Sequence, residues 1–274
     1  MATITAAMVK ELRDKTDAGM MDCKKALAET NGDMDAAVEY LRKAGITKAE
    51  KRAERATKEG KIYALIEGNK GVMIEVLSET DFVAKNEKFF DYVKAAAGRI
   101  LAATEGDGDI SAKAQELEFT NLKELSGVIG ENMQLRRAVR FESAGKLGAY
   151  LHMGGKVGVV VDVEGEVPAD LNVEDICMHV AAFNPQFVCS CAVPAEAVNK
   201  EKEIALAQLD NDEKMANKPA EMKEKIIMGK IAKWYKEVCL VDQPWIRDDK
   251  NTLSKIAPKM VVKRFVRWEI GQEI

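Results

Sequence analysis

Few residues of this 274-residue chain have the chemistry that a catalytic or metal site needs. The chain has only two histidines and five cysteines. One close pair is Cys177 and His179, but residues two apart on a helix do not face each other, so they do not pair as nucleophile and base. The other pair, Cys189 and Cys191, lacks the C-x-x-C spacing of zinc knuckles and redox motifs. We therefore predict no catalytic residues, no metal site and no enzyme.

Motifs that bind nucleotide phosphates are also missing from the sequence. There is no G-x-x-x-x-G-K-[ST] motif, and no G-x-G-x-x-G motif follows a predicted strand. Gly154, Gly155 and Lys156 form a glycine-rich stretch, but the pattern places it in a tight hairpin and not at a helix N-terminus, where backbone N–H groups gather around phosphate. The sequence predicts no cofactor.

One connection, residues 78–86, has a composition that suggests contact with another molecule. Phe82 and Val83 follow Asp81 between a predicted strand and a predicted helix, and either Asp81 or Asn86 could cap that helix. Phe82 could pack under the helix as a staple, the interpretation that periodicity alone favours. Alternatively, the connection is a tip that inserts an aromatic ring into another protein, with a carboxylate beside it.

A second candidate contact lies in the glycine-containing loop near the N-terminus. Met20 and Met21 are adjacent there, next to Gly19. So small a helical bundle does not easily bury both side chains. Either one methionine fills the bundle core, or the pair is an adaptable apolar contact for a partner.

Composition limits the class of protein. Hydrophobic residues make up 47% and charged residues 31%, which excludes disorder, and the net charge of −4 is not that of a general nucleic-acid binder. The longest apolar stretch, Val157–Val161, is far shorter than a membrane span. The N-terminus lacks the features of a signal peptide. An odd, scattered set of cysteines then predicts free thiols and a cytoplasmic location, with no membrane partner.

Hydrophobic periodicity predicts the elements that must position these residues. Residues 1–46 form three short helices capped by Thr5, Asp22 and Asp33, and residues 47–60 form a basic, solvated helical linker. Two similar series of elements follow, each a hairpin with a glycine loop, helical sequence and a third strand. The first series has strands at 61–67, 72–77 and 136–142 and helices at 87–101 and 112–129. The second has strands at 147–152, 157–163 and 262–270 and a helix at 173–183.

The two series suggest an internal duplication. Gly60-Lys61-Ile62 opens the first and Gly145-Lys146-Leu147 opens the second. The predicted fold class is α+β: an N-terminal three-helix bundle, then a duplicated core of two related three-stranded units with helices. The units span residues 61–143, and 144–184 with 239–274. Residues 185–238 form an inserted antiparallel helical hairpin, broken before Pro219, and part of its apolar stripe is available to another chain.

Two long motifs resemble the signatures of the bacterial elongation factor Ts family. They are Leu12–Leu27 (LRDKTDAGMMDCKKAL) and Thr80–Lys85 (TDFVAK). Shorter similarities fall in the same order along the chain at His152, His179–Ala182, Gln243-Pro244 and Phe265–Gly271. The resemblance covers essentially the whole chain.

The resemblance implies a UBA-like bundle and a role as guanine-nucleotide exchange factor, with elongation factor Tu, GDP-bound or nucleotide-free, as the partner. In that family the tip intrudes beside the nucleotide site and disturbs its magnesium, while the bundle and the second core unit make further contacts. The matching tip residues are Thr80, Asp81, Phe82 and Val83, and the other matching residues are Leu12, Gly19, Met20, Met21, His152, Met153 and Gly154. The hairpin corresponds to a protruding coiled coil that can support a homodimer. Displacement of a nucleotide requires no nucleophile or base, in agreement with their scarcity here.

Two departures from the family pattern bear on partner binding. Asp17 stands where the family usually has glycine, and the sequence stops at Ile274, where many members continue into a further helical module. We expect the first to alter the loop contact and the second to remove or replace one contact.

The alternative function is binding to nucleic acid or the ribosome. It would use the basic linker and a C-terminal basic strand that contains Lys255, Lys259, Lys263, Arg264 and Arg267. Binding to phosphates would weaken steeply with salt, which separates this hypothesis from protein-protein exchange.

Overall fold

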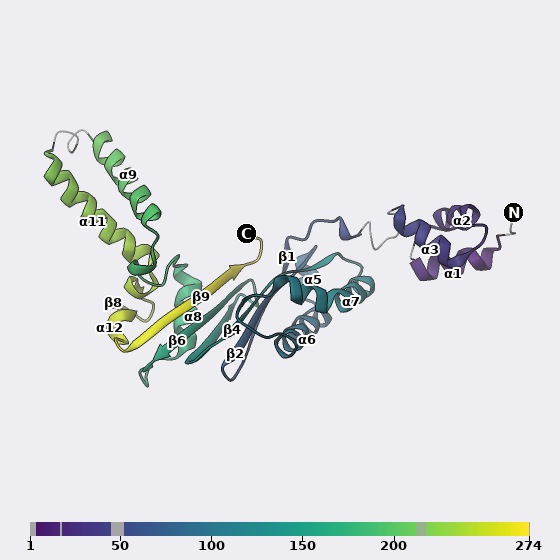
Figure 1. Cartoon of the computed structure of the whole chain (residues 1–274), viewed down its shortest axis with the longest axis horizontal. Helices are drawn as coiled ribbons and strands as arrows, with labels where there is room; N and C mark the ends of the chain where they lie inside the picture. Colours follow the sequence, from purple (N-terminus) through teal and green to yellow (C-terminus); the bar gives the residue numbers. More distant parts are fainter. Residues whose placement is uncertain (1–3, 17, 45–51, 213–214, 216–217, 274) are drawn as a thin grey trace.

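A helical bundle, a core of packed sheets and a protruding helical hairpin make up the chain. The computed structural model describes residues 4–16, 18–44, 52–212, 215 and 218–273. The bundle lies at one end, set apart from the core, and the hairpin lies at the other end (Figure 1). The fold is α+β, as predicted.

The bundle consists of three helices around a small apolar core: α1 (Ala6–Thr16), α2 (Met20–Glu29) and α3 (Met34–Lys43). Leu12, Cys23, Leu27 and Leu41 are fully buried in it. Helix periodicity places these residues on the inward faces, so the bundle closes over a core of short aliphatic side chains.

Two of the three predicted caps are confirmed. The Thr5 hydroxyl accepts a hydrogen bond from the Met8 amide at 3.3 Å, and the Asp33 carboxylate accepts one from the Ala36 amide at 2.9 Å. The prediction of Asp22 as a cap is wrong, because α2 begins at Met20 after an extended Gly19. Asp22 therefore lies in the first turn, where its charge still favours the helix dipole.

The first core unit is an antiparallel sheet with helices on one face. Its strands follow the order β1-β2-β4-β3. The strands are β1 (Glu59–Glu67), β2 (Lys70–Ser78), β3 (Gly108–Asp109) and β4 (Met133–Glu142), and the helices are α5 (Asp81–Ala84), α6 (Glu87–Ala103) and α7 (Ser111–Ile129). The unit therefore has a fourth strand that the three-strand prediction omits, because two residues are too few to show alternation.

The second core unit repeats the hairpin and third strand. Its sheet has the order β5-β6-β9, built from β5 (Lys146–His152), β6 (Val157–Gly165) and β9 (Met260–Glu269) and covered by α8 (Val173–Phe183). The chain between α8 and β9 contains the hairpin helices α9 (Ala195–Asn211) and α11 (Ala220–Val238), the small strands β7 (Pro244–Trp245) and β8 (Asp248–Thr252), and the short helices η1 (Ser190–Ala192), η2 (Leu240–Asp242) and α12 (Leu253–Ile256). The small strands and short helices were not predicted.

The two main sheets pack against each other through a shared apolar cluster. Ile62, Met73, Phe141 and Val160 are buried in it. A Cβ atom at Gly158 would lie 2.3 Å from Ile62 Cγ2 and 3.1 Å from Met73 Sδ. A side chain at this position would have to displace Ile62 and Met73 or push the sheets apart.

The duplication has a physical basis that the sequence identity between the two units does not reveal. Gly60 and Gly145 occupy equivalent positions at the start of each hairpin, where an added Cβ would lie 2.2 Å from Val76 O and 2.0 Å from Val163 O. Each glycine thus allows the first strand to press against the backbone of the second. Gly60 and Gly145, which led to the prediction, therefore have the same structural role in their two units.

A buried carboxylate also occurs at the same place in both units. Glu75 pairs with Ile62 across the first hairpin, and Asp162 pairs with Leu147 across the second. Both acids are at least 96% buried, each lies at a register shift, and each meets arginine from the third strand of its sheet. Asp162 contacts Arg264, 3.1 Å away.

Arg264 also links the two units. It pairs with Asp107, in the connection that precedes β3, and this hydrogen bond holds the pKa of Asp107 below its ordinary value. The third strand of the second unit is thereby tied to a loop of the first.

Two further predictions need correction. The helical linker over 47–60 falls partly on residues outside those described, but Glu59 already belongs to β1, and Arg52 is buried with its guanidinium 2.6 Å from Ser126 O. Arg52 is therefore a tether and not part of a solvated face.

The predicted five free thiols are not all free. Cys189 and Cys191 form a disulfide bond beside η1, whereas Cys23, Cys177 and Cys239 are free and buried. The tight turn at η1 brings the two Cα atoms to 5.3 Å, within the range that a disulfide needs. Among the described residues, no helix is long and apolar enough to cross a membrane.

Alanine at two glycine positions should have opposite effects on stability. We expect Gly158→Ala to lower the free energy of unfolding by about 1–3 kcal/mol, because the added methyl overpacks the contact between the sheets. Gly98→Ala, in the interior of α6 with open space around its Cα, is the matched control and should raise it by about 0.5–1 kcal/mol. Urea unfolding followed by circular dichroism measures both. Equal stability of the two variants would contradict the close approach of the sheets.

Candidate partner-binding site

The predicted tip is a single helical turn between a strand and a long helix. Thr80, not Asp81, is the N-cap of α5, and its hydroxyl accepts a hydrogen bond from the Val83 amide at 3.4 Å. Asp81 is instead the first residue of the turn. Asn86 caps α6 by accepting a hydrogen bond from the Lys88 amide at 2.9 Å. Of the two alternatives for that cap, Asn86 is therefore correct and Asp81 is wrong.

Phe82 projects from this turn into solvent. Its side chain is 81% exposed, whereas Val83 is 8% exposed and Ala84 is 6% exposed. The staple interpretation is wrong, because a single turn directs Phe82 outward and its two successors inward. Val83 packs in the core of the first unit, so it holds the turn in place and does not offer its side chain to a partner in this conformation.

A fixed negative charge lies next to the exposed ring. The Asp81 carboxylate is 2.7 Å from Lys85 Nζ, one helical turn later. The hydrogen bond from Lys85 lowers the pKa of Asp81, so the carboxylate stays ionised at neutral pH. The tip thus presents an exposed apolar ring beside the ion pair of Asp81 and Lys85.

The turn between β5 and β6 carries the second group of predicted residues. Met153 is 69% exposed, and it has a left-handed backbone with φ of 50°. His152 is exposed, with its Nδ1 atom 3.1 Å from the Tyr150 hydroxyl. A bulky residue at positive φ is costly, so the surrounding structure must enforce this turn.

The first core unit enforces it. Gly155 O accepts a hydrogen bond from the Ile62 amide at 2.7 Å, and Gly154 O accepts one from Lys61 Nζ at 3.0 Å. A Cβ atom at Gly155 would lie 2.7 Å from Ile62 O. The turn of the second unit is therefore seated on β1 of the first.

The tip and this turn share one edge of the core. Lys156 follows the turn and lies 3.6 Å from Glu59 at the start of β1. The charge of Lys156 also contributes to the lowered pKa of Asp81. The structure thus brings together two groups that lie about 70 positions apart in the sequence.

The third group lies on the bundle. Met20 is 60% exposed and Met21 is 74% exposed, beside an exposed Gly19. The idea that one methionine fills the bundle core is wrong, since Met8 and Met34 pack there instead. Leu12 is fully buried, so it supports the bundle from within. Asp17 lies outside the described residues.

Sequence reasoning missed two residues that hold the tip. The Glu131 carboxylate accepts hydrogen bonds from the Thr80 hydroxyl at 2.6 Å and from the Thr80 amide at 3.1 Å. The Asn132 amide donates to Glu79 Oε1 at 2.5 Å. The only local signal was Gly130, a typical helix terminator, which has a left-handed backbone after α7.

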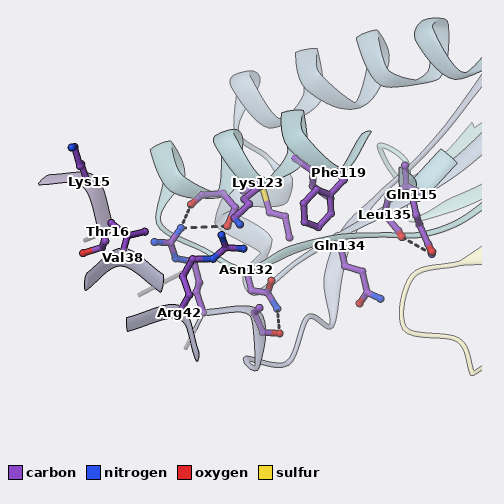
Figure 2. Close-up of a pocket in the computed structure, with 15 residues that line it drawn as sticks. Lys15, Thr16, Val38, Arg42, Gln115, Phe119, Lys123, Asn132, Gln134 and Leu135 are labelled. Atoms are coloured by element: carbon purple, nitrogen blue, oxygen red, sulfur yellow. Dashed lines mark hydrogen bonds between the residues drawn. The ribbon is translucent and has the colours of Figure 1, made fainter. Parts of the chain in front are cut away.

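An open cavity of about 510 Å³ lies between residues of the bundle and residues of the core, and Figure 2 shows its lining. Lys15, Arg42 and Lys123 supply cations, and Phe119 supplies an apolar wall. None of the residues predicted to bind a partner lines it. Among the described residues, no cluster of histidine, cysteine or acidic side chains is arranged to hold a metal ion.

The basic residues of the alternative function are largely neutralised by neighbouring acids. Lys259 lies 2.9 Å from Glu166, and Lys263 lies 3.4 Å from Glu164. Arg264 pairs with two aspartates and Arg267 with Glu269. Four of the five predicted cations therefore have an acidic neighbour, which does not favour phosphate binding by this segment.

The residues His179 and Gln243 have a structural role. His179 is fully buried, with its ring stacked on Phe183 and Trp245. Its Nδ1 accepts a hydrogen bond from the Ile246 amide at 3.3 Å, so the proton resides on Nε2, which donates to Gln243 Oε1 at 2.9 Å. The pair joins α8 to the segment that follows the hairpin.

Comparison with known proteins gives one consistent match. The family model described as "Elongation factor TS" matches residues 79–272. A protein named "Elongation factor Ts" from Halothermothrix orenii is 44% identical, over 97% of this chain and 92% of the relative. Proteins of the same name from Thioalkalivibrio sulfidiphilus and Xanthomonas campestris pv. campestris are 44% and 46% identical, over 99% of this chain and 94% and 93% of the relatives.

Mild acid should destabilise the fold through His179. Burial lowers the pKa of His179 from its ordinary 6.5, so below pH 6.5 the unfolded chain takes up a proton that the folded chain does not. The contribution of neutral His179 to the free energy of unfolding is complete above pH 6.5. It is lost as the pH falls toward the lower pKa that His179 has in the folded chain. Urea unfolding between pH 7 and 5 measures how the free energy of unfolding changes with pH, and His179→Phe should reduce this slope.

Nuclear magnetic resonance titration provides the direct check. His152→Gln leaves a single histidine signal, which is then that of His179. A midpoint at or above 6.5 for this signal would contradict the buried, neutral assignment.

Proposed function

The chain belongs to the elongation factor Ts family, and on that premise we propose that it is a guanine-nucleotide exchange factor of translation, acting on elongation factor Tu in the cytoplasm. The observation that carries the proposal is Phe82, which is 81% exposed beside the ionised Asp81 on a turn fixed to the core. A large aromatic ring held in water at this motif is typical of an interface anchor.

Exchange by this route requires displacement and no bond making. A GTPase holds GDP through contacts to its phosphates and through Mg²⁺. We propose that the tip enters beside that site, where the ring disturbs the packing and the Asp81 carboxylate competes for the surroundings of the cation. Because coupling is reciprocal, a factor that binds the nucleotide-free GTPase more tightly weakens GDP by the same ratio.

The other exposed groups would supply binding energy away from the nucleotide. Met20 and Met21 present flexible thioether side chains that adapt to an apolar surface. The turn at His152, Met153 and Gly154 lies on the same edge of the core as the tip, so we propose that it contacts the same partner. These contacts would orient the tip, which is the step on which displacement depends.

Release of fluorescent GDP from elongation factor Tu tests the proposal. Substoichiometric amounts of the chain should accelerate release, since an exchange factor turns over. Phe82→Ala combined with Asp81→Ala should slow the accelerated rate by about 30-fold, the equivalent of ~2 kcal/mol lost at an interface anchor. The unfolding midpoint should stay unchanged, because both side chains protrude from the fold.

Phe119→Ala is the matched control. Phe119 is also exposed, at 66%, but it lies on α7 and contacts Lys123, not the tip. Its replacement should leave the rate of release close to that of the unchanged chain. If the unchanged chain does not accelerate GDP release, the proposed function is wrong.

We further propose that two copies can associate through the hairpin. Its helices leave Leu206, Met222 and Met228 between 41% and 56% exposed, which is an apolar surface of the kind that partner helices cover. Met228→Lys should shift sedimentation of a concentrated sample toward the monomer. The same sedimentation for both forms would exclude the hairpin as a dimer contact.

A further inference from the structure

We propose that Glu131 is a positioning residue for nucleotide exchange: it acts through Thr80 and fixes the direction in which the turn presents Phe82. The inference rests on the proposed function and extends it to a residue outside the two signature motifs. Glu131 lies 51 positions from Thr80 in the sequence, in the connection between α7 and β4.

The contact between the two residues is two-pronged. One oxygen of the Glu131 carboxylate accepts from the Thr80 hydroxyl at 2.6 Å, and the other accepts from the Thr80 amide at 3.1 Å. Hydrogen bonds to an ionised acceptor are stronger than neutral ones, and two parallel bonds fix an orientation. The Thr80 hydroxyl in turn caps the tip by accepting from the Val83 amide.

Packing alone would hold the turn less firmly. Its inward side consists of Val83 and Ala84, two short side chains on a helix of four residues. Apolar contacts of this size are non-directional, so they oppose departure from the core more than rotation about the helix axis. The Glu131 contact supplies the missing directional restraint at the N-terminal end of the turn.

Glu131 is itself held from behind. Its carbonyl oxygen accepts a hydrogen bond from the Ser126 hydroxyl at 2.6 Å, and the Gly130 amide bonds to Ser126 O at 2.9 Å. Arg52, from the chain that leads in from the bundle, also donates to Ser126 O. The carboxylate therefore projects from a rigid base and not from a free loop.

The neighbouring Asn132 secures the same connection on its other side. Its side-chain amide donates to Ala53 O at 3.1 Å and to Arg55 O at 2.7 Å, and Figure 2 shows it reaching this backbone. Its backbone amide binds Glu79, immediately before Thr80. The connection between α7 and β4 is thus a single anchor for both the tip and the chain that arrives from the bundle.

Steady-state GDP release from elongation factor Tu tests the inference with Glu131→Ala and Glu131→Gln. We expect Glu131→Ala to lower the maximal rate about tenfold, the equivalent of ~1.4 kcal/mol, with little change in the concentration of partner at half-maximal rate. Glu131→Gln keeps one acceptor oxygen and should fall between Glu131→Ala and the unchanged chain. Glu124→Ala, which replaces an exposed glutamate on α7, the helix that precedes Glu131, is the matched control and should keep the full rate.

Two further measurements separate positioning from general stability. Amide hydrogen exchange should become faster at Val83, Ala84 and Lys85 in Glu131→Ala and stay unchanged in β2. In a Thr80→Val background, which lacks the hydroxyl, Glu131→Ala should lower the maximal rate of GDP release by clearly less than tenfold, because the two residues act as one unit.

The outcomes are distinct. An unchanged chain that fails to accelerate GDP release overturns the proposed function and this inference with it. If that chain is active, then full activity of Glu131→Ala, or strict additivity with Thr80→Val, overturns the positioning role alone. Should Glu131→Ala fail to fold, the isosteric Glu131→Gln still decides: a normal maximal rate would refute the role.

Discussion

The close approach of the two sheets at Gly158 is the constraint on which the rest of the structure depends. Ile62 fills the space opposite Gly158, and its backbone amide binds Gly155 O at 2.7 Å. One residue thus sets the distance between the sheets and seats the turn that carries Met153. The tip follows β2, which lies in the same sheet as Ile62. The positions of the tip and the turn relative to each other are therefore set by the rigid core and not by the loops themselves.

The duplicated carboxylates add specificity to this arrangement. Glu75 and Asp162 are buried at equivalent register shifts, each with arginine from the third strand of its own sheet. Buried ion pairs contribute little net stability, since desolvation offsets their attraction. A third strand that paired one residue out of register, however, would move Arg264 away from the buried Asp162. Glu75 is less sensitive to such a shift, because it pairs with both Arg136 and Arg137. Arg264 therefore favours the correct register of β9 and, through Asp107, also links the two units.

The sequence predicted what depends on local patterns and missed what depends on distant contacts. Periodicity located the long helices and strands, and Asp33 capped its helix as expected because a cap is a local interaction. Asp22 was misassigned and the choice between Asp81 and Asn86 stayed open, because the extended backbone of a residue, which the sequence does not show, decides whether it becomes the cap. Phe82 was ambiguous because a four-residue turn shows no period, and Glu131 was invisible because its partner is 51 positions away. The family resemblance located the candidate site, but each of its two motifs contains buried structural residues as well as exposed ones. Leu12 in the first motif and Val83 in the second are both buried.

The separation of the bundle from the core has a consequence for how a complex would come apart. A protein that touches both bodies is held at two points joined by a short stretch of chain, so the second contact forms at a high effective concentration once the first exists. Neither contact then has to be strong alone for the pair to hold. Each can also open and reclose while the other persists, which lets a competing ligand enter by steps and remove the chain without breaking every contact at once. Avidity of this kind combines firm capture with ready release.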